Sequence, residues 1–197
     1  MALFGVPPDQ VTREQRRIAK TINFAIIYGV SGWGLSQQAD ITPEEGEELI
    51  QQYFRHHPKV KEYIERTKRQ AKEQGYVETL LGRRRYFPEF KTKDKAHAGL
   101  RRAAERMAIN APIQGSASDI IKIAMIRLYR AMKERGLRSR MILQVHDELV
   151  LEVPRQELEE VKPLVRGIME GAMKLDIPLK VDMEIGPNWL DMEKVGK

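Results

Sequence analysis

The sequence predicts an α+β fold in which a helical lobe is followed by a lobe of helices and antiparallel strands. Three observations support this prediction. Signals that start and stop helices follow one another closely through the first part of the chain. Two segments show the short apolar runs around polar turns that are typical of hairpins. The chain has 197 residues, which is enough for one large domain or two small ones.

The first helix is expected at about 13–28. Thr12 and Gln15 have the spacing of a capping box, in which each side chain accepts a hydrogen bond from the backbone N–H of the other residue. No proline interrupts the residues that follow, and Gly29 is suited to end the helix.

Two more helices are expected before residue 76. One starts after Thr42, with Pro43 at its first helical position and Glu45 completing a second capping box, and stops before Pro58. The other follows directly and ends at Gly75.

Strands and helices alternate through the rest of the chain. In order, we expect a small hairpin at about 76–87, helices at about 93–110 and 116–135, a hairpin at 141–153, a helix at about 156–173 and a strand at 177–185. Pro112 is expected to separate the two middle helices, because a proline inside a helix removes a backbone hydrogen bond.

The composition excludes several classes of protein. There is no cysteine, so disulfides and thiolate metal sites are excluded and a cytoplasmic location is expected. No apolar run approaches the roughly 18 residues that span a membrane, and the N-terminus lacks the pattern of a signal peptide. We therefore expect no membrane partner.

Positive charge is concentrated in one segment. The net charge is +6, and residues 81–106 contain nine Lys and Arg against three acids, while the rest of the chain is balanced. Such a local excess favours a polyanionic partner. The alternative is a basic face that only contacts water.

One row of side chains along the first helix combines two cations with two aromatics. It consists of Arg16, Lys20, Phe24 and Tyr28, which stand four residues apart. An anion bound at the helix N-terminus would be attracted by both cations and by the helix dipole, and an aromatic further along suits a base or a sugar. A nucleoside triphosphate fits this row. The alternative is an ordinary amphipathic helix, with the aromatics in the core.

Three stretches together resemble motifs of family A DNA polymerases. "RRIAKTINFAIIYG" is similar to motif B, "QVHDE" to motif C, and "RMAINAPIQGSASD" to the segment between these motifs, and they occur in the family's order. The resemblance implies that residues 1–92 form the fingers subdomain and that residues 93–197 form part of the palm, with its antiparallel sheet and flanking helices.

The resemblance also implies roles for the row on the first helix. Arg16 and Lys20 would hold the β- and γ-phosphates of the incoming dNTP, and Lys20 would assist the departure of pyrophosphate. Phe24 would pack against the sugar and base, and Tyr28 would stack at the template side. The implied enzyme is a DNA-directed DNA polymerase, a nucleotidyltransferase of DNA replication and repair in the bacterial cytoplasm, near the nucleoid.

Contacts to primer-template DNA are implied for a further set of residues, namely Arg85, Arg101, Arg106, Asn110, Gln114 and His146. Asn110 and Gln114 resemble residues that hydrogen-bond the minor groove, where the acceptors are nearly the same for every correct base pair. The alternative for these two amides is that they cap helix ends around Pro112. The three arginines would meet the template or its phosphates.

The polar tip of the 141–153 hairpin resembles a metal site. The resemblance implies that Asp147 binds Mg²⁺ beside the primer 3′ end, that His146 touches the primer terminus, and that Glu148 is an auxiliary carboxylate. Two Mg²⁺ ions would then promote attack of the primer 3′-hydroxyl on the α-phosphate.

The second metal aspartate of the family belongs to motif A, and no similar stretch occurs in these 197 residues. We therefore expect a fragment that needs an N-terminal segment bearing motif A and the thumb, that is inactive alone, and that self-associates through an exposed palm edge. Two alternatives are a non-catalytic nucleic-acid-binding module derived from a polymerase, and a phage-type or repair polymerase of the same family.

Overall fold

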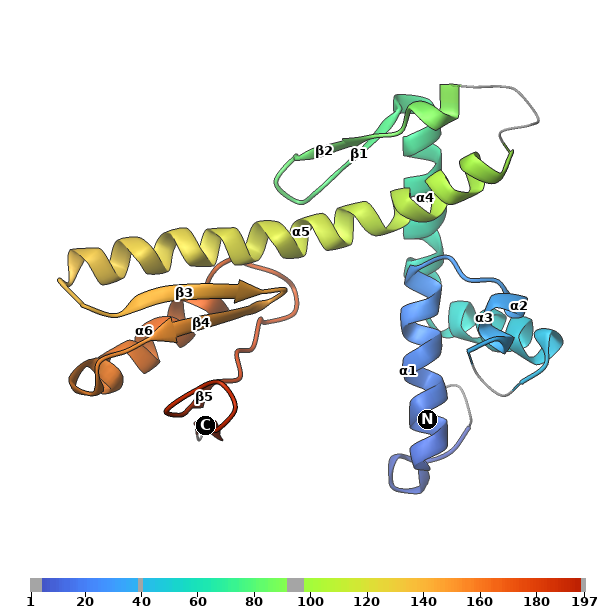
Figure 1. Cartoon of the computed structure of the whole chain (residues 1–197). Coiled ribbons are helices and arrows are strands. Elements are labelled where there is room, and N and C mark those ends of the chain that lie inside the picture. The colour runs from blue at the N-terminus through green and yellow to red at the C-terminus, as the bar shows by residue number, and fades with distance from the viewer. Residues whose placement is uncertain (1–4, 39–40, 92–97, 196–197) are drawn as a thin grey trace. The chain divides into compact units, whose positions relative to one another are not determined.

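The computed structural model describes residues 5–38, 41–91 and 98–195 (Figure 1). The chain forms two compact units, Met1–Gly115 and Ser116–Lys197. This boundary differs from the predicted one at residue 92, because residues before 116 in a long helix share a core with the small hairpin at about 76–87. The names fingers and palm stay a prediction.

The first unit is built mainly of helices. They are α1 (Arg13–Ile27), α2 (Gly32–Ser36), α3 (Pro43–His56), α4 (Pro58–Gln74) and the first part of α5 (Ala98–Glu134), with the short 3-10 helices η1 (Pro8–Gln10) and η2 (Pro88–Lys91). The three helices predicted before residue 76 are confirmed as α1, α3 and α4. The sequence analysis missed α2, η1 and η2, which have at most five residues each.

Both predicted capping boxes are confirmed. Thr12 Oγ1 accepts a hydrogen bond from the Gln15 N–H (3.1 Å), and the Gln15 side chain accepts one from the Thr12 N–H (3.0 Å). Thr42 and Glu45 repeat this exchange at the start of α3. Such caps stabilise a helix end by about 1 kcal/mol, because they pair N–H groups that have no partner within the helix.

The core of the first unit joins α1, α2, α3, α4 and α5. Its buried members are Ile22, Ala25, Ile26, Leu35, Ile50, Tyr53, Ile64 and Ile109. Full burial of an isoleucine contributes roughly 1.5–3 kcal/mol. A half-buried hydrogen bond from the Tyr63 hydroxyl to the Ile109 carbonyl (2.8 Å) adds a polar link between α4 and α5.

The predicted hairpin at about 76–87 is confirmed. Strand β1 (Tyr76–Glu78) pairs antiparallel with β2 (Arg84–Tyr86), and Val77 stands opposite Arg85. Gly82 at its turn has a φ of 78°, which glycine adopts at little cost.

The predicted break at Pro112 is wrong. Helix α5 runs without interruption from Ala98 to Glu134, although Pro112 lies inside it. A proline costs a helix interior about 3 kcal/mol, so packing against other elements must outweigh this loss. The predicted helices at about 93–110 and 116–135 are therefore one helix, apart from residues 92–97, which lie outside the described part of the chain.

The second unit contains the second predicted hairpin. Strand β3 (Arg140–Val145) pairs antiparallel with β4 (Glu148–Glu152), with an irregularity between Met141 and Leu143. The 3-10 helix η4 (Arg155–Glu157) leads into α6 (Leu158–Glu170), which continues through Pro163. Buried residues of α5 and α6, Leu128, Met132, Val161 and Val165, form its core together with one side of the hairpin.

The predicted strand at 177–185 is largely wrong. Only β5 (Glu184–Ile185) is a strand, and it pairs with β6 (Glu193–Lys194). A strand needs a neighbour for its backbone groups, but Pro178 has no N–H and the Val181 N–H donates to the Glu170 side chain (3.1 Å). The small antiparallel sheets among many helices nevertheless confirm the α+β class. Of the described helices, none has the length and apolarity needed to cross a membrane.

The hydrogen bonds between Glu157, just before α6, and the two residues just before β3 predict how acid affects the stability of the second unit. The Glu157 carboxylate accepts hydrogen bonds from Ser139 Oγ (2.6 Å), the Arg138 N–H (2.8 Å) and the Ser139 N–H (2.9 Å). These bonds, that of the Ser139 hydroxyl above all, hold the pKa of Glu157 below its ordinary value of 4.5. The stabilisation is therefore complete above pH 4.5 and is lost as the pH falls through the lowered pKa.

Glu157→Gln is accordingly expected to lose less stability between pH 6 and pH 3 than the unchanged chain does. Urea unfolding followed by circular dichroism at both pH values measures this difference. Glu134→Gln, an exposed carboxylate at the end of α5, is the matched control and should behave like the unchanged chain. If the free energy of unfolding falls by the same amount between pH 6 and pH 3 in Glu157→Gln and in the unchanged chain, the prediction is contradicted.

Candidate nucleotide and nucleic-acid interface

The predicted row on α1 faces solvent along its whole length. Its four members, Arg16, Lys20, Phe24 and Tyr28, are all exposed, Phe24 by 65% and Tyr28 by 49%. The opposite row holds Ile22 and Ile26 in the core. The alternative that places the two aromatics in the core is therefore wrong. Singly exposed apolar side chains are common on protein surfaces, so the exposure of Phe24 makes it available to a ligand but does not by itself require one.

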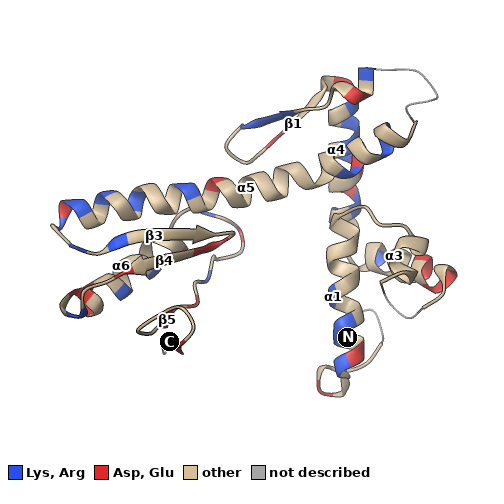
Figure 2. Cartoon of the chain, viewed as in Figure 1, with Lys and Arg blue, Asp and Glu red and all other residues tan. Residues whose placement is uncertain are grey.

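The two cations of the row form no ion pair within the described part of the first unit. Within the described ranges, the side chains of Arg16 and Lys20 make no hydrogen bond or ion pair, whereas neighbouring Arg17 pairs with Glu14. Figure 2 shows Lys and Arg on the N-terminal half of α1. Cations there oppose the helix dipole, and an anion bound beside them would reverse this unfavourable interaction.

The aromatic end of the row meets α5. The Gln114 side chain donates a hydrogen bond to the Tyr28 hydroxyl (3.4 Å). Gly29, with a φ of 66°, ends α1, and a Cβ built there would lie 3.1 Å from Cγ of Arg106. The structure thus brings Tyr28, Gln114 and Arg106 together. Pattern analysis missed this contact, because no local signal links residues 86 positions apart.

Asn110 lies one helical turn before Gln114 on α5. Its Oδ1 atom is buried and accepts no hydrogen bond from the described residues. Because α5 does not end near Pro112, the alternative in which Asn110 and Gln114 cap helix ends is wrong. An unpaired buried acceptor costs about 1–3 kcal/mol, so stability alone does not account for an asparagine here.

The predicted DNA-binding arginines occupy different surroundings. Arg85 is exposed on β2, with its guanidinium 5.4 Å from the centre of the Phe87 ring and 3.2 Å from Met107 Sδ. Arg101 and Arg106 lie on α5, the first half-buried and the second exposed. Two further cations of the basic segment, Lys93 and Lys95, are outside the described residues.

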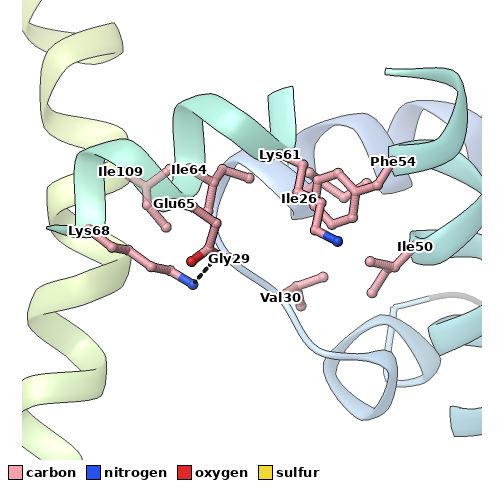
Figure 3. Close-up of a pocket in the computed structure, with 10 residues that line it drawn as sticks. All are labelled: Ile26, Gly29, Val30, Ile50, Phe54, Lys61, Ile64, Glu65, Lys68 and Ile109. Carbon is pink, nitrogen blue, oxygen red and sulfur yellow. Dashed lines mark hydrogen bonds and ion pairs between the residues drawn. The ribbon is translucent and has the colours of Figure 1, made fainter. Parts of the chain in front are cut away.

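A pocket of about 170 Å³ opens in the first unit, and it does not coincide with the row (Figure 3). Apolar side chains from α1, α3 and α4, including Ile26, Phe54 and Ile64, line it, and the Lys68–Glu65 ion pair (3.4 Å) lies at its side. None of the four residues of the row lines this pocket, so it adds nothing to the nucleotide site.

The tip of the β3–β4 hairpin is a two-residue turn of His146 and Asp147. His146 has a φ of 54°, the one positive φ among the described residues other than glycine. A positive φ at the first central position occurs in the type I′ and II′ turns, which match the twist of paired strands. The Gln144 side chain donates to the His146 carbonyl (3.0 Å) and helps to hold this geometry.

The carboxylates at this tip fit one part of a metal site only. Asp147 and Glu148 are both exposed, and Mg²⁺ is held in proteins by such oxygen ligands. However, no group of three or more His, Cys, Asp or Glu side chains that could hold a metal occurs in the described ranges. Asp147 can therefore serve as one ligand, but the described residues alone do not form a two-metal centre.

These features agree with the family to which the chain is matched. The chain belongs to DNA polymerase family A, because the model of that family matches residues 1–191. Among its relatives, the DNA polymerase I of Pseudomonas aeruginosa is 51% identical over 187 residues, which cover 95% of this chain and 20% of the relative. The thermostable DNA polymerase I of Thermus filiformis is 47% identical over 192 residues, covering 98% and 22%.

The fold is similar to that of a solved polymerase domain. This is the POL domain of Pol1 from M. smegmatis in complex with DNA primer-template and dNTP, with a TM-score of 0.84 and 48% sequence identity. The match covers 91% of this chain and 31% of that one. The chain spans about a fifth of the length of the curated relatives named above.

The basic segment leads to a prediction about DNA binding. We expect binding of primer-template DNA by the chain to weaken steeply with salt, because contacts to phosphate release counterions. Arg101→Glu together with Arg106→Glu should flatten the slope of log K against log salt by roughly 2, about 1 per phosphate contact. Fluorescence anisotropy between 50 and 200 mM salt measures this slope.

The matched control carries the same charge change on another helix. Arg66→Glu with Arg69→Glu, both exposed on α4, should leave the slope closer to that of the unchanged chain. If both double variants flatten the slope equally, net charge rather than a defined basic surface governs binding.

Proposed function

We propose that this chain is the part of a DNA polymerase that binds the incoming dNTP and the newly made duplex. The observation that carries this proposal is the exposed row on α1, in which two cations without a partner among the described residues precede two aromatics at four-residue intervals. Membership of DNA polymerase family A supports it, as does the similarity to a polymerase domain that was solved with primer-template and dNTP.

Each residue of the row has a chemical task in this proposal. Arg16 and Lys20 bind the β- and γ-phosphates through charge-assisted hydrogen bonds. Lys20 donates a proton to, or stabilises by its charge, the pyrophosphate oxygen on which negative charge develops. Phe24 covers the sugar and base, and Tyr28 stacks at the template side. Exclusion of water by the aromatics strengthens the phosphate contacts.

The DNA side of the proposal uses α5 and the β3–β4 tip. Asn110 and Gln114 hydrogen-bond the minor groove of the new duplex, Arg85, Arg101 and Arg106 bind phosphates, and His146 touches the primer terminus. The hydrogen bond from Gln114 to the Tyr28 hydroxyl supports a connection between the nucleotide side and the duplex side.

Metal binding is the incomplete part of the site. We propose that Asp147 supplies one carboxylate for Mg²⁺ in the complete enzyme and that Glu148 assists it, while a segment bearing motif A supplies the second carboxylate. Bound Mg²⁺ adds positive charge where the primer hydroxyl and the α-phosphate react. The β3–β4 hairpin pairs with no third strand in the described ranges. We propose that its open edge recruits that segment or a second copy of this chain.

A hybrid polymerase tests this function directly. In it, this chain replaces the corresponding residues of the Pseudomonas aeruginosa relative, to which it is 51% identical. The hybrid is expected to extend a primer in a template-dependent manner. If a folded hybrid binds primer-template but extends nothing, the alternative of a non-catalytic binding module replaces this proposal.

Phe24 should determine how the hybrid treats chain terminators. By resemblance, phenylalanine at this position selects for a 3′-hydroxyl, and tyrosine relaxes that selection. Phe24→Tyr is therefore expected to increase incorporation of dideoxynucleotides relative to dNTPs. Competition between ddTTP and dTTP in primer extension measures the ratio.

The adjacent exposed position Asn23, which lies off the row, provides the control for this change. Asn23→Tyr places the same side chain on the same helix and should leave the ratio unchanged. Equal termination by the Phe24 variant and the unchanged hybrid would show that the row has been assigned the wrong register.

A further inference from the structure

Helix α5 is continuous at a place where its sequence favours a break. Pro112 has no N–H, so the Ala108 carbonyl loses its helical donor, and the proline ring crowds that carbonyl. Asn110 and Gln114 lie on either side of Pro112. A bend there would move the two amides relative to each other.

The tip of the β1–β2 hairpin contacts α5 at Gly115, just after Pro112. A Cβ built on Gly115 would overlap Cγ2 of Thr79, so no larger residue fits without movement. The Arg83 guanidinium donates a hydrogen bond to the Gly115 carbonyl (2.9 Å). Figure 1 shows the hairpin beside α5. One contact is steric and the other is charge-assisted, and both act on the residue that follows Gln114.

The hairpin tip is itself well held. Thr79 Oγ1 accepts hydrogen bonds from the N–H groups of Leu81 (3.3 Å) and Arg83 (3.2 Å). The Thr79 N–H donates to the Arg83 carbonyl (3.0 Å), and the Gly82 N–H donates to the Thr79 carbonyl (3.0 Å). A tip with this many internal bonds can fix the position of what it touches.

The base of the hairpin contacts α5 on the N-terminal side of Pro112. Ala104, Ala108 and Ala111 pack against Val77 and Phe87, all of them buried. Small side chains on this face of α5 let the hairpin approach closely. Arg85 of β2 also lies 3.2 Å from Met107 Sδ. The hairpin therefore holds α5 on both sides of Pro112, which explains why the predicted break does not occur.

We propose that Arg83 is a positioning residue. Together with Thr79, it clamps α5 at Gly115, keeps the helix continuous across Pro112, and so fixes where Asn110 and Gln114 lie. The alternative is that Arg83 is one more cation that binds DNA phosphate. The consequence for DNA synthesis rests on the proposed role of the two amides in the minor groove, whereas the clamp itself does not.

Hydrogen exchange in the 197-residue chain tests the clamp without any activity. Arg83→Gln is expected to speed exchange of the α5 amides at residues 113–117 by at least about fivefold, since a hydrogen bond from a charged donor is lost. Gly115→Ala should do the same. The matched control is Arg84→Gln, which removes the same charge from the same hairpin but from a side chain that pairs with Glu78 (2.7 Å). It should leave these amides unchanged.

Discrimination against mismatched primer ends, measured in the hybrid polymerase, tests the positioning. Arg83→Gln and Gln114→Ala should each lower the ratio of matched to mismatched extension, and the double variant should be little worse than either one, because both act through the same contact. Arg84→Gln should preserve the ratio. A phosphate contact would instead predict additive losses and similar effects of the two arginines.

Each outcome bears on a different claim. Unchanged exchange in Arg83→Gln overturns the clamp. Faster exchange with additive losses in the double variant overturns the positioning role and leaves Arg83 as a structural residue. If the unsubstituted hybrid folds and extends no primer, the proposed function fails, and the exchange measurement still decides whether the clamp exists.

Discussion

Lys20→Ala in the hybrid polymerase is expected to lower the turnover number as well as to raise KM for dNTPs. Lys20 is exposed and has no partner in the described part of the chain, so its ammonium group is available to the triphosphate. A charge-assisted hydrogen bond is worth roughly 1.5–3 kcal/mol, which corresponds to a roughly 10- to 150-fold change. If the bond strengthens as pyrophosphate departs, this loss appears in turnover.

Arg17→Ala is the matched control, because it removes one positive charge from the same helix. Arg17 lies off the row and pairs with Glu14, so its loss should have little effect on turnover. Single-turnover measurements at saturating dNTP separate the chemical step from binding. A Lys20 variant with normal turnover and a raised KM would show that Lys20 only binds the substrate.

The isolated 197-residue chain is expected to extend no primer. Asp147 is exposed at a turn, and no cluster of three metal-binding side chains surrounds it within the described ranges. Mg²⁺ keeps most of its waters and gains little from one or two neighbouring carboxylates. Activation of a primer hydroxyl needs firmly bound metal ions, which these carboxylates alone do not hold. Activity should therefore lie below detection in a primer-extension assay of rigorously purified chain.

Addition of a polypeptide that bears motif A and the thumb should restore part of the activity if it docks on the chain. Asp147→Ala should abolish the restored activity, since it removes the carboxylate at the turn. Glu152→Ala, at the far end of the same strand pair, is the matched control and should retain it. Extension by the isolated chain that depends on Asp147 would show that the second carboxylate lies within these residues.

Some features follow from short stretches of sequence. The capping boxes at Thr12 and Thr42 need residues three positions apart, and they form in the structure as the spacing predicts. Gly82, with its positive φ, likewise lies at the turn of the hairpin expected at about 76–87. Local geometry decides these features, because a hydrogen bond over three residues does not depend on the rest of the fold.

The spacing of the row on α1 also follows from the sequence, but its environment does not. Residues at intervals of four share one side of any helix, so the spacing alone predicts that Phe24 and Tyr28 lie on the same side. Which side is buried depends on the partners of the helix. Here Ile22 and Ile26 pack against α2, α3 and α4, which leaves the aromatics exposed and makes the site available to a ligand.

The tertiary structure alone decides the remaining features. Local rules predict that α5 breaks at Pro112. Close packing of the β1–β2 hairpin on Ala104, Ala108 and Gly115 instead keeps the helix continuous. The segment at 177–183 has apolar alternation but no neighbouring strand among the described residues. The contact between Tyr28 and Gln114 joins distant residues. In each case the free energy comes from groups far away in the chain, and a local pattern contains no information about them.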